Sequence, residues 1–313
     1  MNRYVILLAL CLCARGYVSA GYDPFVDGAK ADVRIKVVDD LGEPVRDAMV
    51  SAVFLTDVQK VDVTKGATDS KGCFSAARTC IGQMRLWIRK DGYYDTKTVP
   101  TEFRTNTGAE ATKTHRWSEQ TVELPVVLKK QRNPVKLIHK GGTYSDIKYP
   151  ILAEVKGFDL ERFDWCPPYG KGRYADIQIS TEYWRDEKDW LKVYDKTVVS
   201  MTNTLDGAYF ADIDAFSSMR YPYAANTNAV FQREFIFEYD RRTGNVTKNI
   251  TMPKGKCLVF RTRTKLDEKG CLKEANYGII TESFDPFADL DLEVFFNPTP
   301  NDTNLEAVRT TKK

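Results

Sequence analysis

The sequence predicts an all-β protein built from two β-sandwich domains. β-branched and aromatic residues recur in short runs along the 313-residue chain, of which aromatic residues make up 12%, and this favours packed strands over a disordered chain. Turn residues separate the runs at hairpin spacing, and no window shows a convincing helical period. The length also exceeds that of a typical single domain, so two domains are expected.

Residues 1–20 are predicted to be a secretory signal peptide. Arg3 supplies a positive start, Val5–Cys13 is apolar, and Val18-Ser19-Ala20 ends in the small-residue pattern that signal peptidase cleaves. The apolar run is too short to span a bilayer, and no later window approaches the roughly eighteen apolar residues that a span needs. We therefore expect an exported protein, periplasmic or extracellular, with no transmembrane segment after cleavage.

The charge balance excludes two classes of partner. The leader holds two of the 46 Lys and Arg residues and none of the 43 Asp and Glu residues, which leaves 44 basic against 43 acidic residues. This near-neutral balance gives no basis for a nucleic-acid or anionic-membrane partner.

Five cysteines follow the leader, an odd number that leaves at least one thiol unpaired or paired between chains. Cys73 and Cys80 are the candidate disulfide, because they are close enough in sequence to bridge a strand end to the following turn. Cys257 and Cys271 are not expected to bond, since a hairpin turn at Lys265–Gly270 would place them about seven residues apart along the strands.

The chain is divided into consecutive segments by composition and turn residues. These are a lead-in at residues 21–30, a first domain at 31–130, a linker at 131–134, a second domain at 135–297, and a disordered polar tail at 298–313. The strands expected in the first domain are Ala31–Asp39, Val45–Leu55, Val61–Thr64, a run from Cys73, Met84–Arg89 and Thr121–Lys129, with a polar loop at 104–118. Those expected in the second are Val135–His139, Tyr149–Val155, Ala175–Trp184, Leu191–Ser200, Phe231–Tyr239, Asn245–Met252, Cys257–Thr264, Cys271–Ser283 and Leu290–Phe296.

Three motifs in the first domain resemble a known family. They are Gly42-x-Pro44-Val45-x-x-Ala48-x-Val50, Thr68-Asp69-x-x-Gly72-x-Phe74 and Lys90-x-Gly92-Tyr93. In this order they are similar to the carboxypeptidase regulatory-like domain over roughly residues 31–130. The resemblance implies a seven-stranded transthyretin-like, immunoglobulin-like sandwich and almost nothing about function.

The enzyme that gives that family its name is not expected in this chain. A zinc carboxypeptidase needs two histidines and a glutamate as ligands, and neither His115 nor His139 lies in a ligand spacing. Residues 134–297, with the stretch GFDLERFDWCPPYGKG and the hairpin RTRT…DEKG…ANYG, also look like a family of exported bacterial proteins that is itself uncharacterised. That likeness implies no function.

Aromatic residues give the best candidates for a contact surface. The stretch Gly157–Asp176 contains five of them without a helical or strand period, and more follow in the first half of the second domain. Aromatic faces stack on sugar rings and anchor protein interfaces. Alternation along Ala175–Trp184 places Tyr183 in the core and Trp184 on the surface. The candidate contact residues are Trp165, Tyr169, Trp184 and Trp190.

No residue is predicted to be catalytic. Cys166 has no neighbouring histidine and precedes two prolines, so nothing activates its thiol. Asp159, Glu161 and Asp164 do not single out an acid and a nucleophile. No cofactor is expected, and solvated turns are favoured over a structural Ca²⁺, which stays an alternative at two acidic runs. The runs are Asp206, Asp212 and Asp214, and Asp285, Asp289 and Asp291.

The sequence therefore predicts an exported, non-enzymatic binding or surface-interaction module whose partner is a carbohydrate or a protein. A structural or assembly component of the cell envelope is the first alternative. A hydrolase with an unrecognised pair of carboxylates is the second.

Overall fold

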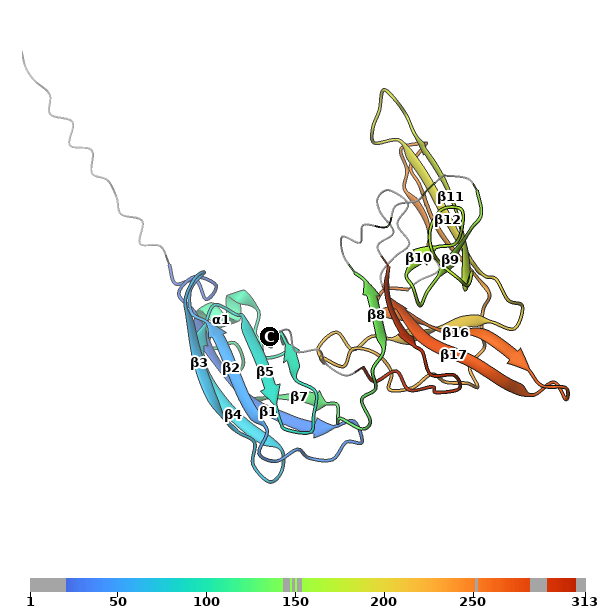
Figure 1. The fold of residues 1–313 in the computed structure, drawn as a ribbon. Coiled ribbons are helices and arrows are strands. Elements are labelled where there is room, and N and C mark those ends of the chain that lie inside the picture. Colours follow the sequence, from blue (N-terminus) through green and yellow to red (C-terminus); the bar gives the residue numbers. More distant parts are fainter. Residues whose placement is uncertain are drawn as a thin grey trace, which may run out of the picture.

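The protein is all-β within the residues that the computed structural model describes, with one short helix. The described residues are 21–142, 147, 150, 154–250, 253–281 and 292–307. The sheets form two sandwiches, one from each half of the chain (Figure 1). No helix in the described ranges is long and apolar enough to cross a membrane. The expected leader, most of the expected strand Tyr149–Val155, and the acidic run from Asp285 to Asp291 lie outside these ranges.

The first sandwich packs a three-stranded sheet, order β4-β1-β7, against a four-stranded sheet, order β3-β2-β5-β6. Its strands are β1 (Ala29–Asp39), β2 (Met49–Leu55), β3 (Val61–Ala67), β4 (Cys73–Cys80), β5 (Met84–Arg89), β6 (Thr96–Thr98) and β7 (Val122–Leu128). Strands β1 and β7 run parallel and the other neighbours antiparallel. Alternate residues of β1, such as Val33, Ile35 and Val37, are fully buried, as their spacing predicts.

The prediction of a polar loop over residues 104–118 is wrong for its centre, where α1 (Gly108–Thr114) forms. Thr107 accepts a hydrogen bond from the backbone N–H of Glu110, and the Glu110 carboxylate accepts one from the N–H of Thr107. This reciprocal capping satisfies donors at the helix start. A helix of seven residues is too short for its period to be recognised.

The second sandwich packs a six-stranded sheet, order β10-β9-β11-β12-β14-β15, against a five-stranded sheet, order β13-β16-β17-β18-β8. Its strands are β8 (Ile138–Gly141), β9 (Lys156–Asp159), β10 (Asp164–Trp165), β11 (Ile177–Arg185), β12 (Val193–Met201), β13 (Gly207–Asp212), β14 (Glu234–Asp240), β15 (Thr247–Ile250), β16 (Lys256–Leu266), β17 (Leu272–Thr281) and β18 (Glu293–Asn297). Phe158, Phe235, Phe260 and Phe296 form the centre of the core between the two sheets.

The five-stranded sheet is buried on both faces. Its second face carries Val259, Tyr277 and Ile279, which pack against Tyr221 and Leu305. The covering layer consists of the connection before β14 and of residues 298–307. The prediction of a disordered tail is therefore wrong for 298–307, because this segment supplies core residues.

The covering layer also joins the two sandwiches. The backbone N–H of Lys97 in β6 donates to the Phe216 carbonyl (2.8 Å), and that of Ser218 donates to the Asp95 carbonyl (2.8 Å). These bonds continue the four-stranded sheet of the first sandwich across the free edge of β6. Strand pairing therefore connects the two halves of the chain.

A buried carboxylate provides a second connection. Glu306 accepts hydrogen bonds from the Tyr94 hydroxyl (2.9 Å) and from the backbone N–H groups of Arg132 (2.9 Å) and Asn133 (2.7 Å). The expected linker is thus held in place by the end of the chain.

The candidate disulfide between Cys73 and Cys80 is wrong. The two residues lie at opposite ends of β4 and both are free thiols. Seven residues of extended strand separate their Cα atoms by about 23 Å, whereas a disulfide needs less than about 7 Å. The strand runs straight through the segment in which a turn was expected. Cys257 and Cys271 are also unbonded.

Candidate functional site

A bulge in β16 places a charged side chain inside the second sandwich. Arg263 has φ of +57°, which is uncommon for a residue other than glycine. The pairing of β16 with β17 changes register between Thr262 and Lys265. An extra residue in one strand redirects its side chain, and here it turns the Arg263 guanidinium toward the stretch Gly157–Asp176.

The guanidinium binds three carboxylates from that stretch. Its Nε and Nη2 atoms donate to the two oxygens of Asp176 at 2.9 and 3.0 Å, the bidentate geometry that arginine favours. Nη2 also donates to Asp159 at 3.3 Å, and Nη1 donates to Glu161. The side chains of Asp159 and Asp176 are almost fully buried. Arg263 therefore supplies the positive charge that buried carboxylates require.

Asp159 also fixes the shape of the loop that follows it. Its carboxylate accepts hydrogen bonds from the backbone N–H groups of Arg162 (3.0 Å), Arg173 (2.7 Å) and Tyr174 (3.2 Å). These bonds close the loop between the two ends. The stretch is therefore rigid because its backbone is bonded to a buried side chain, although it has almost no regular structure.

Asp206 holds the bulge from the other side. It accepts hydrogen bonds from the backbone N–H groups of Arg263 (3.0 Å) and Thr264 (2.9 Å). Because of the bulge, these N–H groups have no partner on the neighbouring strand, and the Asp206 carboxylate accepts their hydrogen bonds instead. The neighbouring Thr262 hydroxyl donates to Asp176 (2.9 Å).

Burial and the charged partners have opposite effects on the pKa values of Asp176 and Arg263. Burial raises the pKa of Asp176, and hydrogen bonding to Arg263 offsets part of that effect. Burial lowers the pKa of Arg263, but its bonds to Asp176 and Glu161 outweigh this and leave the pKa raised. The guanidinium is therefore charged at every physiological pH, and the carboxylates are held as its partners.

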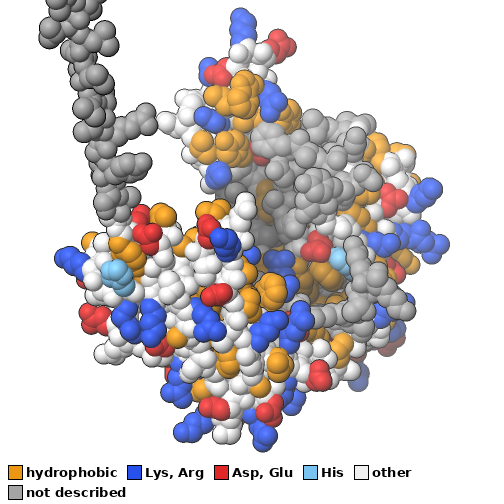
Figure 2. Space-filling model, turned by 90° about the vertical axis from the view of Figure 1, so that its left-hand side faces the viewer, with side chains coloured by type: hydrophobic (Ala, Val, Ile, Leu, Met, Phe, Trp, Pro, Cys, Tyr) orange, Lys and Arg blue, Asp and Glu red, His pale blue; other side chains and the backbone are white. Residues whose placement is uncertain are grey.

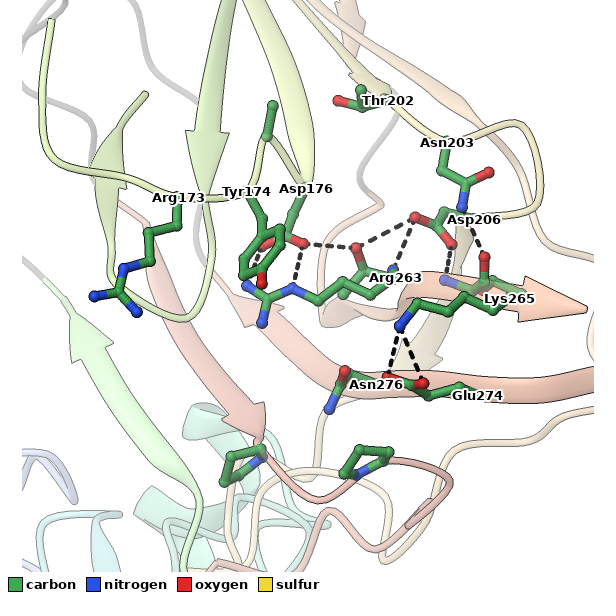
Figure 3. Close-up of a pocket in the computed structure, with 15 residues that line it drawn as sticks. Arg173, Tyr174, Asp176, Thr202, Asn203, Asp206, Arg263, Lys265, Glu274 and Asn276 are labelled. Carbon is green, nitrogen blue, oxygen red and sulfur yellow. Dashed lines mark hydrogen bonds and ion pairs between the residues drawn. The ribbon is translucent and has the colours of Figure 1, made fainter. Parts of the chain in front are cut away.

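A groove of about 590 Å³ lies beside the cluster (Figure 3). Its lining combines an aromatic ring, two prolines and many polar side chains. The main contributors are Arg173, Tyr174, Asn203, Thr264, Lys265, Glu274, Asn276, Pro298 and Pro300. Lys265 and Glu274 form an ion pair across neighbouring strands (3.1 Å).

Tyr174 is the aromatic wall of this groove and is 58% exposed. Its ring lies over the Arg263 guanidinium, with the guanidinium carbon 4.5 Å from the ring centroid, and the same carbon lies 4.9 Å from the centroid of the Phe296 ring. Cation–π contact holds one face of the ring in a fixed position. Figure 3 shows the ring in front of the guanidinium at the wall of the groove.

Thr264 does not contribute its hydroxyl to the groove. Its hydroxyl oxygen is buried and has no hydrogen-bond partner among the described residues. Buried polar atoms are normally paired, but this one is too deeply buried to face the groove.

The residues predicted for contact do not gather at this groove. Trp165 is 4% exposed and packs edge-to-face on Phe158 with ring centroids 5.1 Å apart, so its assignment as a surface contact is wrong. Because Gly157–Asp176 has no strand or helical period, the sequence could not show which of its aromatic side chains are buried and which are exposed. Tyr169 is partly exposed and donates to Glu154 (3.0 Å), a bond that raises the pKa of the phenol.

Trp184 and Trp190 are exposed on the β11–β12 hairpin, away from the groove lining. Tyr183, expected in the core, is also exposed. The burial of alternate residues in β11 ends at Thr181. The rest of the hairpin extends beyond the sandwich (Figure 1), and residues 182–185 of β11 are exposed on both faces of the strand.

The groove and its support were missed as a site from the sequence. Arg263, Asp206 and Asn276 come from segments far from the aromatic stretch, and the Arg263–Asp176 contact spans 87 residues. One local signal did exist. Asp159 and Asp176 each sit among apolar strand residues, in GFDL and YADI, and a carboxylate in that position needs a buried partner.

The described residues of the cluster do not supply the parts of a hydrolase. The carboxylates are occupied by Arg263 and by backbone N–H groups. Burial, together with the charges of Asp159, Asp176 and Asp164, raises the pKa of the Cys166 thiol, and this disfavours the reactive thiolate.

The described ranges also contain no group of three or more His, Cys, Asp or Glu residues arranged to hold a metal ion. Asp206, Asp212 and Asp214 do not converge. Asp212 pairs with Lys256 (2.6 Å) and Asp214 with Lys129 (3.5 Å). Each carboxylate of this run thus serves a separate contact.

No protein-family model and no curated protein matches the chain. Among solved structures, a shaft pilin from Lactobacillus rhamnosus GG is similar over 89% of this chain and 95% of its own, at 10% identity and a TM-score of 0.23. A protein from Bacteroides uniformis described as carbohydrate-binding is similar over 88% and 99%, at 4% identity and a TM-score of 0.19. A 3-chlorocatechol 1,2-dioxygenase from Rhodococcus opacus is similar over 34% of this chain, at 15% identity and a TM-score of 0.25, and the match spans 61% of the dioxygenase. Scores this low say nothing about function.

Proposed function

We propose that the protein is a non-enzymatic binding module that takes a saccharide in the groove beside Arg263. One observation carries the proposal: Tyr174 presents an exposed ring that is held in place by Arg263, at the wall of a groove whose lining combines apolar and polar surface. The volume of about 590 Å³ lies in the range of known small-molecule sites. Because residues 1–20 resemble a signal peptide, we propose that binding takes place outside the cytoplasm.

A sugar fits this lining for two reasons. The apolar face of a pyranose ring stacks on an aromatic side chain, and the fixed position of Tyr174 reduces the entropy lost on binding. Ring hydroxyls both donate and accept hydrogen bonds, and the lining offers donors and acceptors together from Lys265, Glu274 and Asn276.

A glycan array probed with the full chain tests the proposal. We expect binding to a restricted set of glycans, followed by saturable heat in a calorimetric titration with the strongest one. A clean negative on the array, together with a specific protein recovered by pull-down, would reject the saccharide in favour of a protein ligand. Release of a smaller sugar during the titration would reject the non-enzymatic assignment.

The joint between the sandwiches favours a second candidate, a structural or assembly component of the cell envelope. The β6 edge is paired with the covering layer, and Glu306 is bonded to three groups across the joint. Such a joint suits a part that transmits load. Under this proposal the first sandwich is a spacer or docking module of the carboxypeptidase regulatory-like type. Co-purification with a large complex, without a change in melting temperature on adding any soluble glycan, is the expected result.

A further inference from the structure

We propose that the outer face of the β3-β2-β5-β6 sheet docks the acidic segment 282–291 of a second copy of this chain. The inference does not depend on the saccharide groove. It rests on the composition of the face, on the absence of carboxylates from it, and on the sequence of that segment.

The outer face is apolar at its centre. The inward residues of β2 and β5, among them Phe54 and Leu86, are fully buried, so the residues between them point outward. These outward residues line a hollow of about 430 Å³. Its apolar side chains are Met49, Val53, Val61, Val63 and Trp87. Met49, Val61, Val63 and Trp87 are all exposed, and such a cluster on a folded surface marks an interaction site.

The charged groups on this face are all positive. Register places Lys65 opposite Ser51, Arg85 opposite Val53, and Lys97 opposite Trp87. Arg89 lies opposite Met49 in the same way, and these outward rows contain no carboxylate. Figure 2 shows hydrophobic side chains lying between Lys and Arg side chains on the face of the molecule that includes the first sandwich.

Two of these cations already have a contact. Lys97 lies over the Trp87 ring at 5.7 Å from its centroid, and Arg89 pairs with Asp95 of the β5–β6 connection (3.3 Å). Lys65 and Arg85 remain for a partner. The partner chemistry that fits is an acidic chain segment with apolar side chains. A saccharide does not fit, because the apolar hollow has few groups to pair with hydroxyls.

Segment 282–291, with the sequence ESFDPFADLD, has the complementary composition. It contains four carboxylates and no Lys or Arg, and it also contains Phe284, Phe287 and Leu290. Its flanking strands β17 and β18 belong to the second sandwich, whereas β3 and β2 lie on the far side of the first (Figure 1). We therefore assign the contact to two molecules, with the second sandwich of one on the first sandwich of the next. This head-to-tail contact is open at both ends and can extend.

Binding of a labelled peptide tests the contact directly. The acetylated, amidated peptide ESFDPFADLD should bind the full chain saturably by fluorescence anisotropy, and more weakly as salt is added. The double variant Lys65→Glu/Arg85→Glu should weaken binding by about tenfold or more. The matched reversal Arg185→Glu/Lys188→Glu, on the exposed β11–β12 hairpin, should leave it unchanged. Equal binding by both variants, or by a scrambled peptide, overturns the proposal.

Sedimentation velocity tests the whole molecule. The wild-type chain should associate as its concentration rises, and the variants Lys65→Glu/Arg85→Glu and Asp285→Lys/Asp289→Lys should each be monomeric alone. A mixture of the two should associate again, since the reversed face then meets the reversed segment. Restoration in the mixture also shows that both variants are folded. A wild-type chain that stays monomeric at every concentration, or a mixture that does not associate, contradicts the proposal.

Discussion

Arg263 supplies the positive charge that compensates the buried carboxylates of the second sandwich. Its guanidinium forms ion pairs with the Asp159, Asp176 and Glu161 carboxylates, and within the described residues no other cation forms an ion pair with them. A buried ion pair adds little over an apolar replacement of the whole group, but removing one partner leaves a charge without compensation.

Replacing Arg263 by methionine should therefore destabilise the protein by about 3–5 kcal/mol, because two buried carboxylates lose their counter-charge. The control is Arg242→Met, since the Arg242–Asp240 pair lies at the surface, where solvent screens the charges and the loss of the pair costs little. Urea unfolding of both variants measures the difference. Similar losses in the two variants would show that the cluster does not act as a buried unit.

Tyr221 should make stability fall at alkaline pH. Burial and the nearby charge of Glu293 raise its pKa to about 12, whereas in the unfolded chain the value is about 10. The contribution is thus present below pH 10 and is lost between about pH 10 and 12, where only the unfolded chain ionises. The free energy of unfolding of Tyr221→Phe should decrease less steeply over this range than that of the wild type. Identical slopes in urea titrations would contradict the assignment.

At the scale of elements, alternation predicted most strands because the second sandwich and β1 bury alternate residues. It failed where that condition is absent. Strand β13 (Gly207–Asp212) lies in a connection that looked irregular, because its burial does not alternate. The Gly157–Asp176 stretch is rigid because its backbone and carboxylates bond to buried partners. Its partners Arg263 and Thr262 lie far along the chain, so no local pattern could identify them.

Turn glycines with the same backbone conformation should differ in their tolerance of a side chain. Gly42 and Gly72 have φ of +86° and +74°, which costs an alanine about 1–2 kcal/mol at either site. A Cβ at Gly42 would meet open space, whereas at Gly72 it would overlap the Val37 carbonyl oxygen. Gly72→Ala should therefore cost about 1–3 kcal/mol more than Gly42→Ala. Thermal unfolding of the two variants measures this, and equal melting temperatures would show that the turn relaxes without cost.

At the scale of the whole molecule, the joint makes the two sandwiches one body. The resemblance of the first domain could not predict this, because it covers roughly residues 31–130 and the joint is built by residues 214–223 and 298–307. The latter segment looked disordered because it is polar and contains two prolines. It is ordered because Leu305 and Glu306 are buried. Two adjacent buried residues in a polar segment do not form a hydrophobic period, so the sequence pattern gave no sign of them.

Removing the Glu306 carboxylate should loosen the joint. In Glu306→Ala the Tyr94 hydroxyl and the backbone N–H groups of Arg132 and Asn133 each lose a hydrogen bond to a carboxylate, and a hydrogen bond to a charged group is worth about 1.5–3 kcal/mol. We expect calorimetry to resolve two transitions where the wild type shows one. Glu268→Ala, in the exposed turn between β16 and β17, serves as the control. A single unchanged transition in Glu306→Ala would mean that the sandwiches are coupled by other contacts.

The most direct test of the proposed function compares three proteins on the same glycan array: the wild type, Tyr174→Ala and Trp190→Ala. Both substitutions remove an exposed aromatic side chain, but only Tyr174 lines the groove. We expect the wild type and Trp190→Ala to bind the same glycans, and Tyr174→Ala to lose at least about tenfold in affinity, or 1.4 kcal/mol. Unchanged binding by Tyr174→Ala, with loss in Trp190→Ala, would contradict the groove and move the site to the β11–β12 hairpin.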